Sequence, residues 1–367
     1  MANCLMEAAP GWNKYVLRKT KSNGDFVKEI KDTFDEAVKN APAIILLDDM
    51  DKFANGDNKH PDCDEYVTIQ SCIDFVKNKD VIVIATVNKP FKLPDALIRS
   101  GRFDRHIHMY YPSDEDARLI IASYLKKCKN VAQDIDTELI ARLLIGQSCA
   151  VLETIINESG LCAGYERADK LQMRHILDAT LKIVYDIPNR NVESDEDTER
   201  RAYHEAGHVI VNEHFSPGSV TLATVIRSGR TGGVTTHNRF HNNTYESVEE
   251  TACVCLGSRA AMEYKFGIAD IGCSGDLSKS FDIIRENISE NGVRGFGLLT
   301  DERCGDSQVR VTKIETACNV ELERLYLETK KIIHDNVDFL EKVAQALIEK
   351  KVITCNDIAE IRKELAA

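Results

Sequence analysis

Two histidines four residues apart, with a glutamate directly after the first, form an H-E-x-x-H pattern at His204, Glu205 and His208. Four residues make close to one turn of an α-helix, so both imidazoles project from the same face and can bind one metal ion. Glu205 lies off that line, where its carboxylate can take a proton from water at the metal without becoming a ligand. The pattern predicts a Zn²⁺ site with Glu205 as the general base.

A chance match on a charged, solvated helix is the alternative interpretation of this pattern. With ten histidines in 367 residues, such a match is rare. Apolar residues follow at 209–211, which indicates a half-buried helix. Glycine inside a helix costs about 0.5–1 kcal/mol relative to alanine, so Gly207 is expected where something packs closely. Both features favour the metal site.

A catalytic zinc ion needs a third protein ligand and leaves one position open for water. Asp276 is the preferred third ligand, because it follows a Gly-Cys-Ser-Gly loop and opens a predicted helix. The alternative is that Asp276 caps the helix, with its carboxylate accepting free backbone N–H groups at the N-terminus. Spacing alone favours neither interpretation. Glu263 and Asp270 are the competing ligands.

Three other histidines lie near the motif. His237 and His241 also stand four residues apart, but in a polar stretch that is typical of a loop. A metal pair without an ordered backbone or outer-shell contacts is weak, so both are predicted to be solvated. His214 is predicted to lie at the surface near the end of the zinc helix.

Polar side chains follow two short apolar runs early in the chain. Ala43–Leu47 ends on Asp48 and Asp49, and Val81–Ala85 is soon followed by Asn88. Continuous apolar runs are typical of parallel strands buried on both faces, with chemistry at their carboxyl ends. Asp48 could hold Mg²⁺ for a nucleotide, the next acid could orient water, and Asn88 could sense a γ-phosphate.

Several arginines, among them Arg102 and Arg105, follow the second of these strands. An arginine supplied to a neighbouring subunit's phosphate can couple nucleotide hydrolysis to assembly. For any one arginine alone, a surface salt bridge is the favoured interpretation.

The rest of the chain is predicted to be mainly helical. An amphipathic helix is expected at 25–39, with one apolar face formed by Phe26, Ile30, Phe34 and Val38. Proline, asparagines and a charge run between 187 and 201 predict a domain boundary. A Gly-rich stretch with β-type residues is expected at 219–236. Further helices are expected at 114–127, 136–144, 149–167, 172–185, 247–265, 276–291 and 311–350. The last of these helices is expected to be broken near 334–336.

Composition sets limits on the function. Hydrophobic residues make up 43% and charged residues 29%, which is typical of a globular protein. The formal net charge of −12 and the lack of a basic stripe disfavour nucleic-acid binding. The twelve cysteines are scattered without C-x-x-C spacing, so reduced thiols are expected. The sequence has no apolar run of about 18 residues and no export signal, so the chain itself is expected to be soluble.

The order of these motifs resembles that of the membrane-anchored, ATP-dependent zinc proteases of the FtsH type, nearly end to end. The segment 48–51 looks like the family's Walker B motif, and 81–105 looks like its second region of homology. This resemblance implies that Asn88 is a sensor and that Arg102 and Arg105 are arginine fingers.

The C-terminal half carries the more specific part of the resemblance. The segment 204–208 is similar to the family's zinc motif, and 257–267 with 274–277 resembles the stretch that ends in its aspartate ligand, which favours Asp276. The segment 232–235 resembles the edge strand beside the family's active site, where an extended peptide could pair.

The departures from the family pattern fall on the ATPase half. No G-x-x-x-x-G-K-[ST] loop is present, and 5–9 resembles the helix that follows it, which suggests that the chain begins just downstream. Asp49 stands where the family has glutamate, 19–24 lacks the aromatic of a pore loop, and the membrane-spanning N-terminal region is absent.

The resemblance implies a multidomain protein with a partial α/β AAA-type parallel-sheet subdomain at 1–110, a helical lid at 111–188 and a mainly α zinc-metallopeptidase domain at 194–367. It implies a homo- or hetero-hexameric ring in the cytoplasm. Because the apparatus for ATP-driven unfolding is not intact, the expected substrates are unfolded or flexible polypeptides. Membrane contact would come only through a missing N-terminal region or partner subunits. Binding of ATP with Mg²⁺ stays open, because the phosphate loop is missing. A scaffold or regulatory subunit of such a ring is the alternative, and an ATPase remodeller with an idle peptidase domain is a third.

Overall fold

The structure, a computed structural model, describes residues 2–20, 25–54, 63–133, 135–187, 195–227, 232–238, 244–268, 270–293 and 308–366. The chain divides into two compact units, Met1–Met109 and Tyr110–Ala367. The three-domain division stays a prediction, since the second proposed boundary falls on 188–194, outside the described residues.

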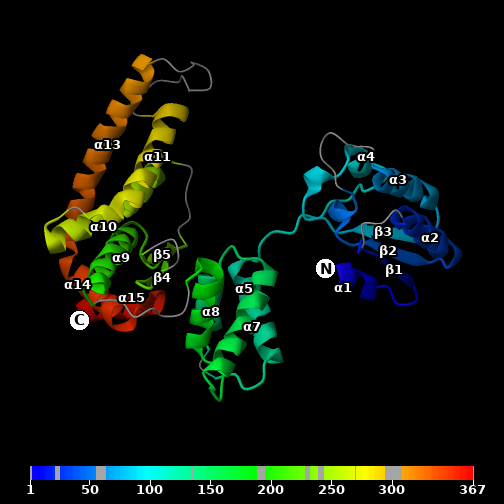
Figure 1. Ribbon diagram of the computed structural model, residues 1–367, viewed down its shortest axis with the longest axis horizontal. Coiled ribbons are helices and arrows are strands. Elements are labelled where there is room, and N and C mark those ends of the chain that lie inside the picture. The colour runs from blue at the N-terminus through cyan, green and yellow to red at the C-terminus, as the bar shows by residue number, and fades with distance from the viewer. Residues whose placement is uncertain are drawn as a thin grey trace. The chain divides into compact units, whose positions relative to one another are not determined.

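The first unit contains a three-stranded parallel sheet with the order β1-β2-β3 (Figure 1). Its strands are β1 (Asn13–Leu17), β2 (Ala43–Leu47) and β3 (Val81–Ala85), and its helices are α1 (Ala2–Glu7), α2 (Phe26–Lys39), α3 (Asp64–Val76) and α4 (Asp95–Ile98). Strands β2 and β3 match the predicted runs residue for residue. Strand β1 was missed, because its sequence has no continuous apolar run. Of its five residues, only Leu17 is buried.

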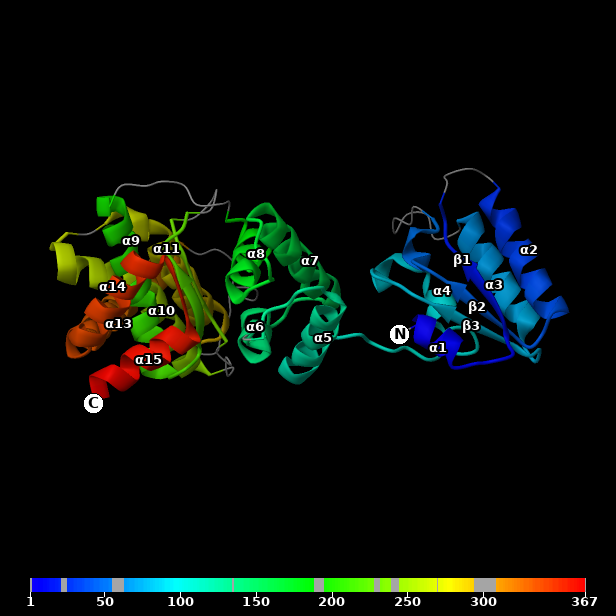
Figure 2. The ribbon, with the colours of Figure 1, turned by 90° about the horizontal axis from the view of Figure 1, so that it is seen from below.

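The central strand β2 is buried on both faces, as its continuous apolar run predicted. Ala43, Ile45 and Leu47 pack with α2 and α3, whereas Ile44 and Leu46 pack with residues of and after α1. Figure 2 shows α1 on one side of the sheet and α2 and α3 on the other.

The same prediction is wrong for β3, because Ile82 is 47% exposed. Among the described residues, only the short helix α1 and the turn after it cover that face, and they pack over Ile44, Leu46 and Ile84. In α2 the fourth buried position is Ala37, and Val38 is only partly buried.

The second unit begins with four helices, α5 (Asp114–Lys127), α6 (Thr137–Leu143), α7 (Cys149–Tyr165) and α8 (Met173–Tyr185). All four were predicted to within two residues at each end. Side chains of Ser113, Asp136 and Ser148 accept backbone N–H groups at the starts of α5, α6 and α7. Such caps satisfy donors that the helix itself leaves free.

The rest of the second unit packs helices around a small antiparallel sheet with the order β5-β4-β6. Its elements are α9 (Asp195–Phe215), β4 (Val220–Thr224), β5 (Val234–His237), α10 (Tyr245–Phe266), α11 (Ser274–Glu290), α13 (Gln308–Asp335), α14 (Val337–Lys350), β6 (Val352–Thr354) and α15 (Cys355–Ala366). The predicted break lies at Asn336, between α13 and α14. Strand β6 was missed, since its three residues are too few to show a period, and the twelve-residue helix α15 was missed as well.

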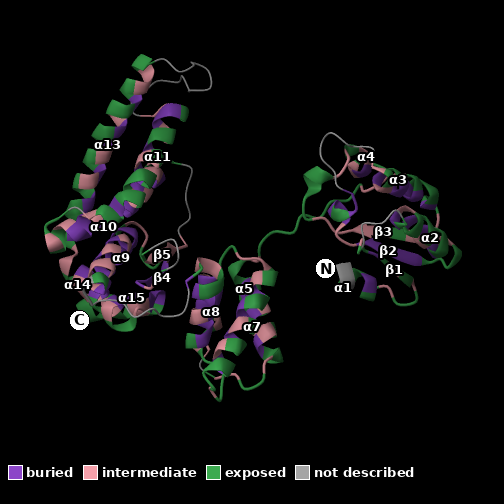
Figure 3. Ribbon diagram, viewed as in Figure 1, coloured by how far each residue is buried: buried purple, intermediate pink, exposed green. Residues whose placement is uncertain are grey.

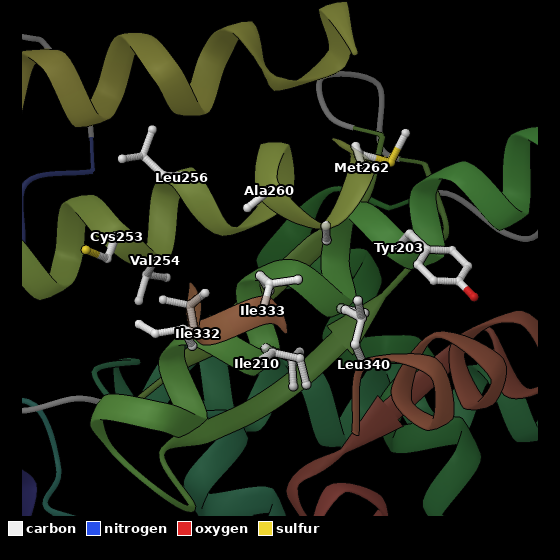
Figure 4. Close-up of a cluster of buried hydrophobic side chains, with 14 of the residues drawn as sticks. Tyr203, Ile210, Cys253, Val254, Leu256, Ala260, Met262, Ile332, Ile333 and Leu340 are labelled. Carbon is white, nitrogen blue, oxygen red and sulfur yellow. The ribbon is translucent and has the colours of Figure 1, made fainter. Parts of the chain in front are cut away.

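Helix α9 is the centre of this part. It contacts α10, α13, α14 and β4, and much of it is coloured purple, as buried, in Figure 3. Figure 4 shows Ile210 of α9 in the same cluster as Ile333 of α13 and Leu340 of α14. Burial on several sides fixes α9, and this helix carries His204 and His208.

Two glycines allow α9 and α10 to cross at very short range. A Cβ atom on Gly207 would meet the carbonyl group of Gly257 and would lie 2.8 Å from the Cβ of Ala261. A Cβ atom on Gly257 would lie 2.5 Å from the carbonyl oxygen of Gly207. Gly207 therefore sits where close packing was predicted, and the packing partner is helix α10.

We expect Gly207→Ala to destabilise the second unit by about 1–3 kcal/mol, because the added methyl group overpacks the crossing. Gly160→Ala in α7 is the matched control, since a Cβ atom there meets nothing within 4 Å. That control should stabilise the fold by about 0.5–1 kcal/mol through helix propensity. Urea unfolding of both variants measures the difference, and equal effects would contradict the close-crossing account.

No helix in the described part of the chain is both long and apolar enough to cross a membrane.

Candidate metal centre

Helix α9 and the first turn of α11 bring three side chains together. His204 and His208 project from the same face of α9, with ring centroids 5.1 Å apart. The Oδ2 atom of Asp276 lies 3.2 Å from Nε2 of His204 and 3.3 Å from Nε2 of His208. The structure thus places the preferred third carboxylate between the two imidazoles.

This trio fits a zinc ion. Its three ligand atoms lie within 4.8 Å of one another. Among the described residues, this trio is the cluster of histidine, cysteine and acidic side chains that could hold a metal ion. Zinc binds imidazole nitrogen and carboxylate oxygen at about 2.0–2.2 Å with tetrahedral geometry, which separates neighbouring ligand atoms by about 3.3 Å. The measured separations from Asp276 match this value. The three side chains are partly exposed, which leaves an approach for a further ligand.

Outer contacts fix the orientation of all three side chains. Nδ1 of His208 donates to the backbone carbonyl oxygen of Val254 at 2.7 Å, and Nδ1 of His204 lies 3.6 Å from Sγ of Cys273. The hydroxyl of Ser258 donates to Oδ2 of Asp276 at 3.0 Å. Each Nδ1 therefore has a partner away from the trio, and each Nε2 is aimed at it, as metal-binding histidines require.

The charges of the trio support one another when no metal is bound. Burial alone lowers the pKa of His204, but its bond to Asp276 and its contact with Cys273 outweigh burial and raise that pKa to about 10. Burial alone raises the pKa of Asp276, but the two histidines hold it far below its usual range. A divalent ion held by His204, His208 and Asp276 would balance the charge of the carboxylate instead, and its binding would release the imidazole proton.

The two competing carboxylates are engaged elsewhere. Asp270 accepts the backbone N–H of Gly272 at 2.7 Å and pairs with Arg200 at 2.9 Å. Glu263 pairs with Lys330 at 2.9 Å. Neither carboxylate joins the trio.

Glu205 lies beside the trio without belonging to it. Its side chain is buried, with 4% of the residue exposed, and its Oε2 accepts the hydroxyl of Thr235 at 2.6 Å. The helical offset from His204 and His208 was predicted from the sequence. The resemblance placed the segment 232–235 beside the active site, but the contact between Thr235 and Glu205 was not predicted.

The other histidines differ partly from prediction. His237 is wrongly predicted as a solvated loop residue, because it is half-buried in β5 and pairs in register with Val220 of β4. His241 lies outside the described residues. His214, in the last turn of α9, is exposed as predicted.

Three of the predicted nucleotide residues meet at the carboxyl ends of β2 and β3. The hydroxyl of Thr86 donates to Oδ1 of Asp48 at 2.8 Å, and Nδ2 of Asn88 donates to Oδ1 of Asp49 at 3.0 Å. A hydrogen bond from Lys52 at 2.7 Å holds the pKa of Asp49 below its usual value. The clustering at one sheet edge was expected for parallel strands.

The two predicted arginine fingers differ in their surroundings. Arg102 donates to the side chains of Asp74 and Gln70 and to the carbonyl oxygen of Ala96, within its own unit. This is the salt-bridge alternative that the sequence left open. Arg105 is exposed.

Sequence reasoning missed the outer contacts of the metal trio. Val254 and Ser258 stand four residues apart on α10, so one face of that helix contacts both His208 and Asp276. Helical spacing was available as a signal for this pair. No spacing signal pointed to Cys273 or Thr235, which reach the site from a 3₁₀ turn and a short strand. For Thr235, the resemblance indicated only that the segment 232–235 lies beside the active site.

A buried helix that presents two histidines one turn apart, with an aspartate from a second helix, defines a zinc-metallopeptidase type of site. The model of peptidase family M41 matches residues 191–361, and that of the ATPase family associated with various cellular activities (AAA) matches residues 13–111. These two matches cover the metal centre and the parallel sheet.

Whole-chain relatives agree with both matches. The chain is 28% identical to ATP-dependent zinc metalloprotease FtsH 1 of Thermoanaerobacter sp. (strain X514), over 97% of this chain and 66% of the relative. It is 30% identical to the FtsH protease of Ureaplasma parvum serovar 3, over 89% of this chain and 48% of that protein. The chain thus spans less than two thirds of these relatives. It belongs to the FtsH-type AAA zinc metalloprotease family.

Proposed function

We propose that this chain is a zinc metalloendopeptidase in which His204, His208 and Asp276 hold the metal ion. One observation carries the proposal. A single carboxylate oxygen lies within 3.3 Å of both Nε2 atoms, while both Nδ1 atoms have partners elsewhere. The names of the relatives, which describe zinc metalloproteases, support the same metal and reaction.

Glu205 is the general base in this proposal. When bound, zinc lowers the pKa of water and polarises the carbonyl group of the scissile peptide bond. Glu205 accepts the proton of the attacking water and returns it to the leaving amine. Its burial and its single short bond to Thr235 keep the carboxylate in one orientation for both transfers.

The proposed substrates are unfolded or flexible polypeptides. Strand β5 lies at one edge of the sheet, where only its inner side pairs with β4 among the described strands. An extended peptide can add to such an edge through backbone hydrogen bonds, and an unfolded or flexible segment adopts that conformation most readily. Binding there would lie beside Glu205, because Thr235 belongs to the same strand.

The nucleotide part of the proposal concerns the first unit. Asp48, Asp49 and Asn88 would face ATP and Mg²⁺ at the sheet edge, within a ring that is homo- or hetero-hexameric. Arg105 is the better placed of the two arginines to reach a neighbouring subunit, since Arg102 is bonded to Asp74. A regulatory role for a chain without a phosphate loop stays the alternative, and the cytoplasmic location stays a prediction.

Cleavage of unstructured casein tests the proposed function. The purified chain should cleave casein, a chelator should stop cleavage, and added Zn²⁺ should restore it. Zinc content is measured on the same samples. A chain that carries one zinc ion and cleaves neither casein nor short flexible peptides would contradict the proposal and favour the regulatory alternative.

A further inference from the structure

The carboxylate of Glu205 is buried, yet the described structure gives its side chain one hydrogen-bond donor. That donor is the hydroxyl of Thr235, 2.6 Å from Oε2. An ionised carboxylate away from water needs such donors, because burial without them is strongly unfavourable. A distance this short is typical of a hydroxyl that donates to a charged oxygen. The orientation of the Glu205 side chain therefore depends on one residue of β5.

The segment before Thr235 contacts the other oxygen of the same carboxylate. A Cβ atom on Gly233 would lie 2.6 Å from Oε1 of Glu205 and 2.7 Å from the carbonyl oxygen of Thr224. Gly233 and Thr235 stand two residues apart, so extended backbone directs both toward the same face. The Thr235 hydroxyl therefore holds Oε2 of Glu205, and Oε1 lies against Gly233, where a side chain would collide with it.

We infer that Thr235 is a positioning residue for the general base, and that β5 both receives the substrate peptide and orients Glu205. This inference rests on the proposed function. A peptide that adds to the edge of β5 would then be held by the strand that aims the base at it. Turnover, rather than substrate affinity, should depend on the Thr235 hydroxyl, because the peptide would use the backbone of β5.

A purely structural role for Thr235 is the competing explanation, and the neighbouring residue supplies a control for it. Thr236 points to the opposite face of β5, where its hydroxyl bonds with that of Thr221 at 2.7 Å and lies 3.3 Å from the carbonyl oxygen of Leu222. The two threonines share a strand, partial burial and a hydroxyl bond. They differ in that only Thr235 contacts Glu205.

The kinetic test compares Thr235→Val, Thr235→Ser and Thr236→Val, all zinc-loaded. Thr235→Val should lower kcat by about 10–100-fold with KM within about twofold, because a displaced base loses alignment. Thr235→Ser keeps the hydroxyl and should retain most of the activity, and Thr236→Val should retain kcat. Unchanged kcat in Thr235→Val, or an equal loss in Thr236→Val, would overturn the inference.

A second test measures the contact between Thr235 and Glu205 through protein stability, without an activity assay. Thr235→Val should lower the urea midpoint of the metal-free protein, because it leaves a buried carboxylate without its donor. In a Glu205→Ala background the same substitution should cause no further shift, as a double-mutant cycle requires for coupled groups. Equal shifts in both backgrounds would show that Thr235 does not act through Glu205 and would overturn the inference.

These outcomes separate the inference from the function on which it rests. If the wild-type chain cleaves casein and Thr235→Val cleaves it equally well, the inference fails and the peptidase stands. If the zinc-loaded wild type cleaves no polypeptide, both fail together.

Discussion

Replacing Glu205 by glutamine is expected to reduce casein cleavage by about 10²–10⁴-fold, the usual contribution of a general base. Glutamine has nearly the same shape and can still accept the hydroxyl of Thr235, but it cannot take a proton from water at neutral pH. The metal ligands His204, His208 and Asp276 are untouched. Zinc content should therefore stay at one ion per chain while turnover is lost.

A surface variant controls for the change in charge. Glu246→Gln removes one negative charge from an exposed position in the first turn of α10 and should leave cleavage unchanged. Initial rates with labelled casein, measured at matched zinc content, give the comparison. Cleavage by Glu205→Gln at the wild-type rate would remove Glu205 from the mechanism.

Replacing Asp276 by asparagine is expected to weaken zinc binding by more than about 100-fold. Loss of an outer contact alone typically weakens metal binding by about 10–100-fold, and loss of a ligand should exceed that. The carboxylate also supplies the only negative charge in the trio, and the two histidines hold its pKa far below the usual range. A neutral amide would leave two imidazoles with no charge to balance the ion.

Asp270→Asn is the matched control for this loss, since Asp270 is a nearby carboxylate that the sequence left as a competing ligand. It pairs with Arg200 and Gly272 and should bind zinc as tightly as the wild type. Competition with a fluorescent zinc chelator measures both variants. Normal affinity in Asp276→Asn together with weak affinity in Asp270→Asn would reverse the ligand assignment.

The sequence predicted the parts of the site that depend on helical spacing. His204, Glu205 and His208 belong to one helix, so a single period sets their directions. Asp276 lies 68 residues beyond His208, and spacing alone made its role no more than even with that of a cap. The resemblance to a family favoured it, and the structure shows the distance.

Contacts between separate elements could not be predicted in this way. Thr235 reaches Glu205 only because β5 lies against α9, and that contact depends on pairing with β4 and on the space at Gly233. His237 was misjudged for the same reason, because four residues of β5 become a strand only through pairing with β4. Short strands gain their structure from partners rather than from their own pattern.

The exposure of Ile82 shows a similar limit in the first unit. The apolar run Val81–Ala85 predicted the strand correctly, but the cover over each face depends on other elements. Arg102 is another case, since its partners in α3 lie about 30 residues earlier in the chain. A list of residue types could not choose between a salt bridge and an arginine finger.

Zinc K-edge absorption of the purified chain tests the central claim most directly. The account predicts one zinc ion per chain with nitrogen and oxygen ligands at about 2.0–2.2 Å and no sulfur at about 2.3 Å. Histidine scattering should fall to one ring in His208→Ala if the metal is retained at all. A chain without stoichiometric zinc, or with zinc bound by cysteine sulfur, would contradict the assignment of His204, His208 and Asp276 as the metal centre.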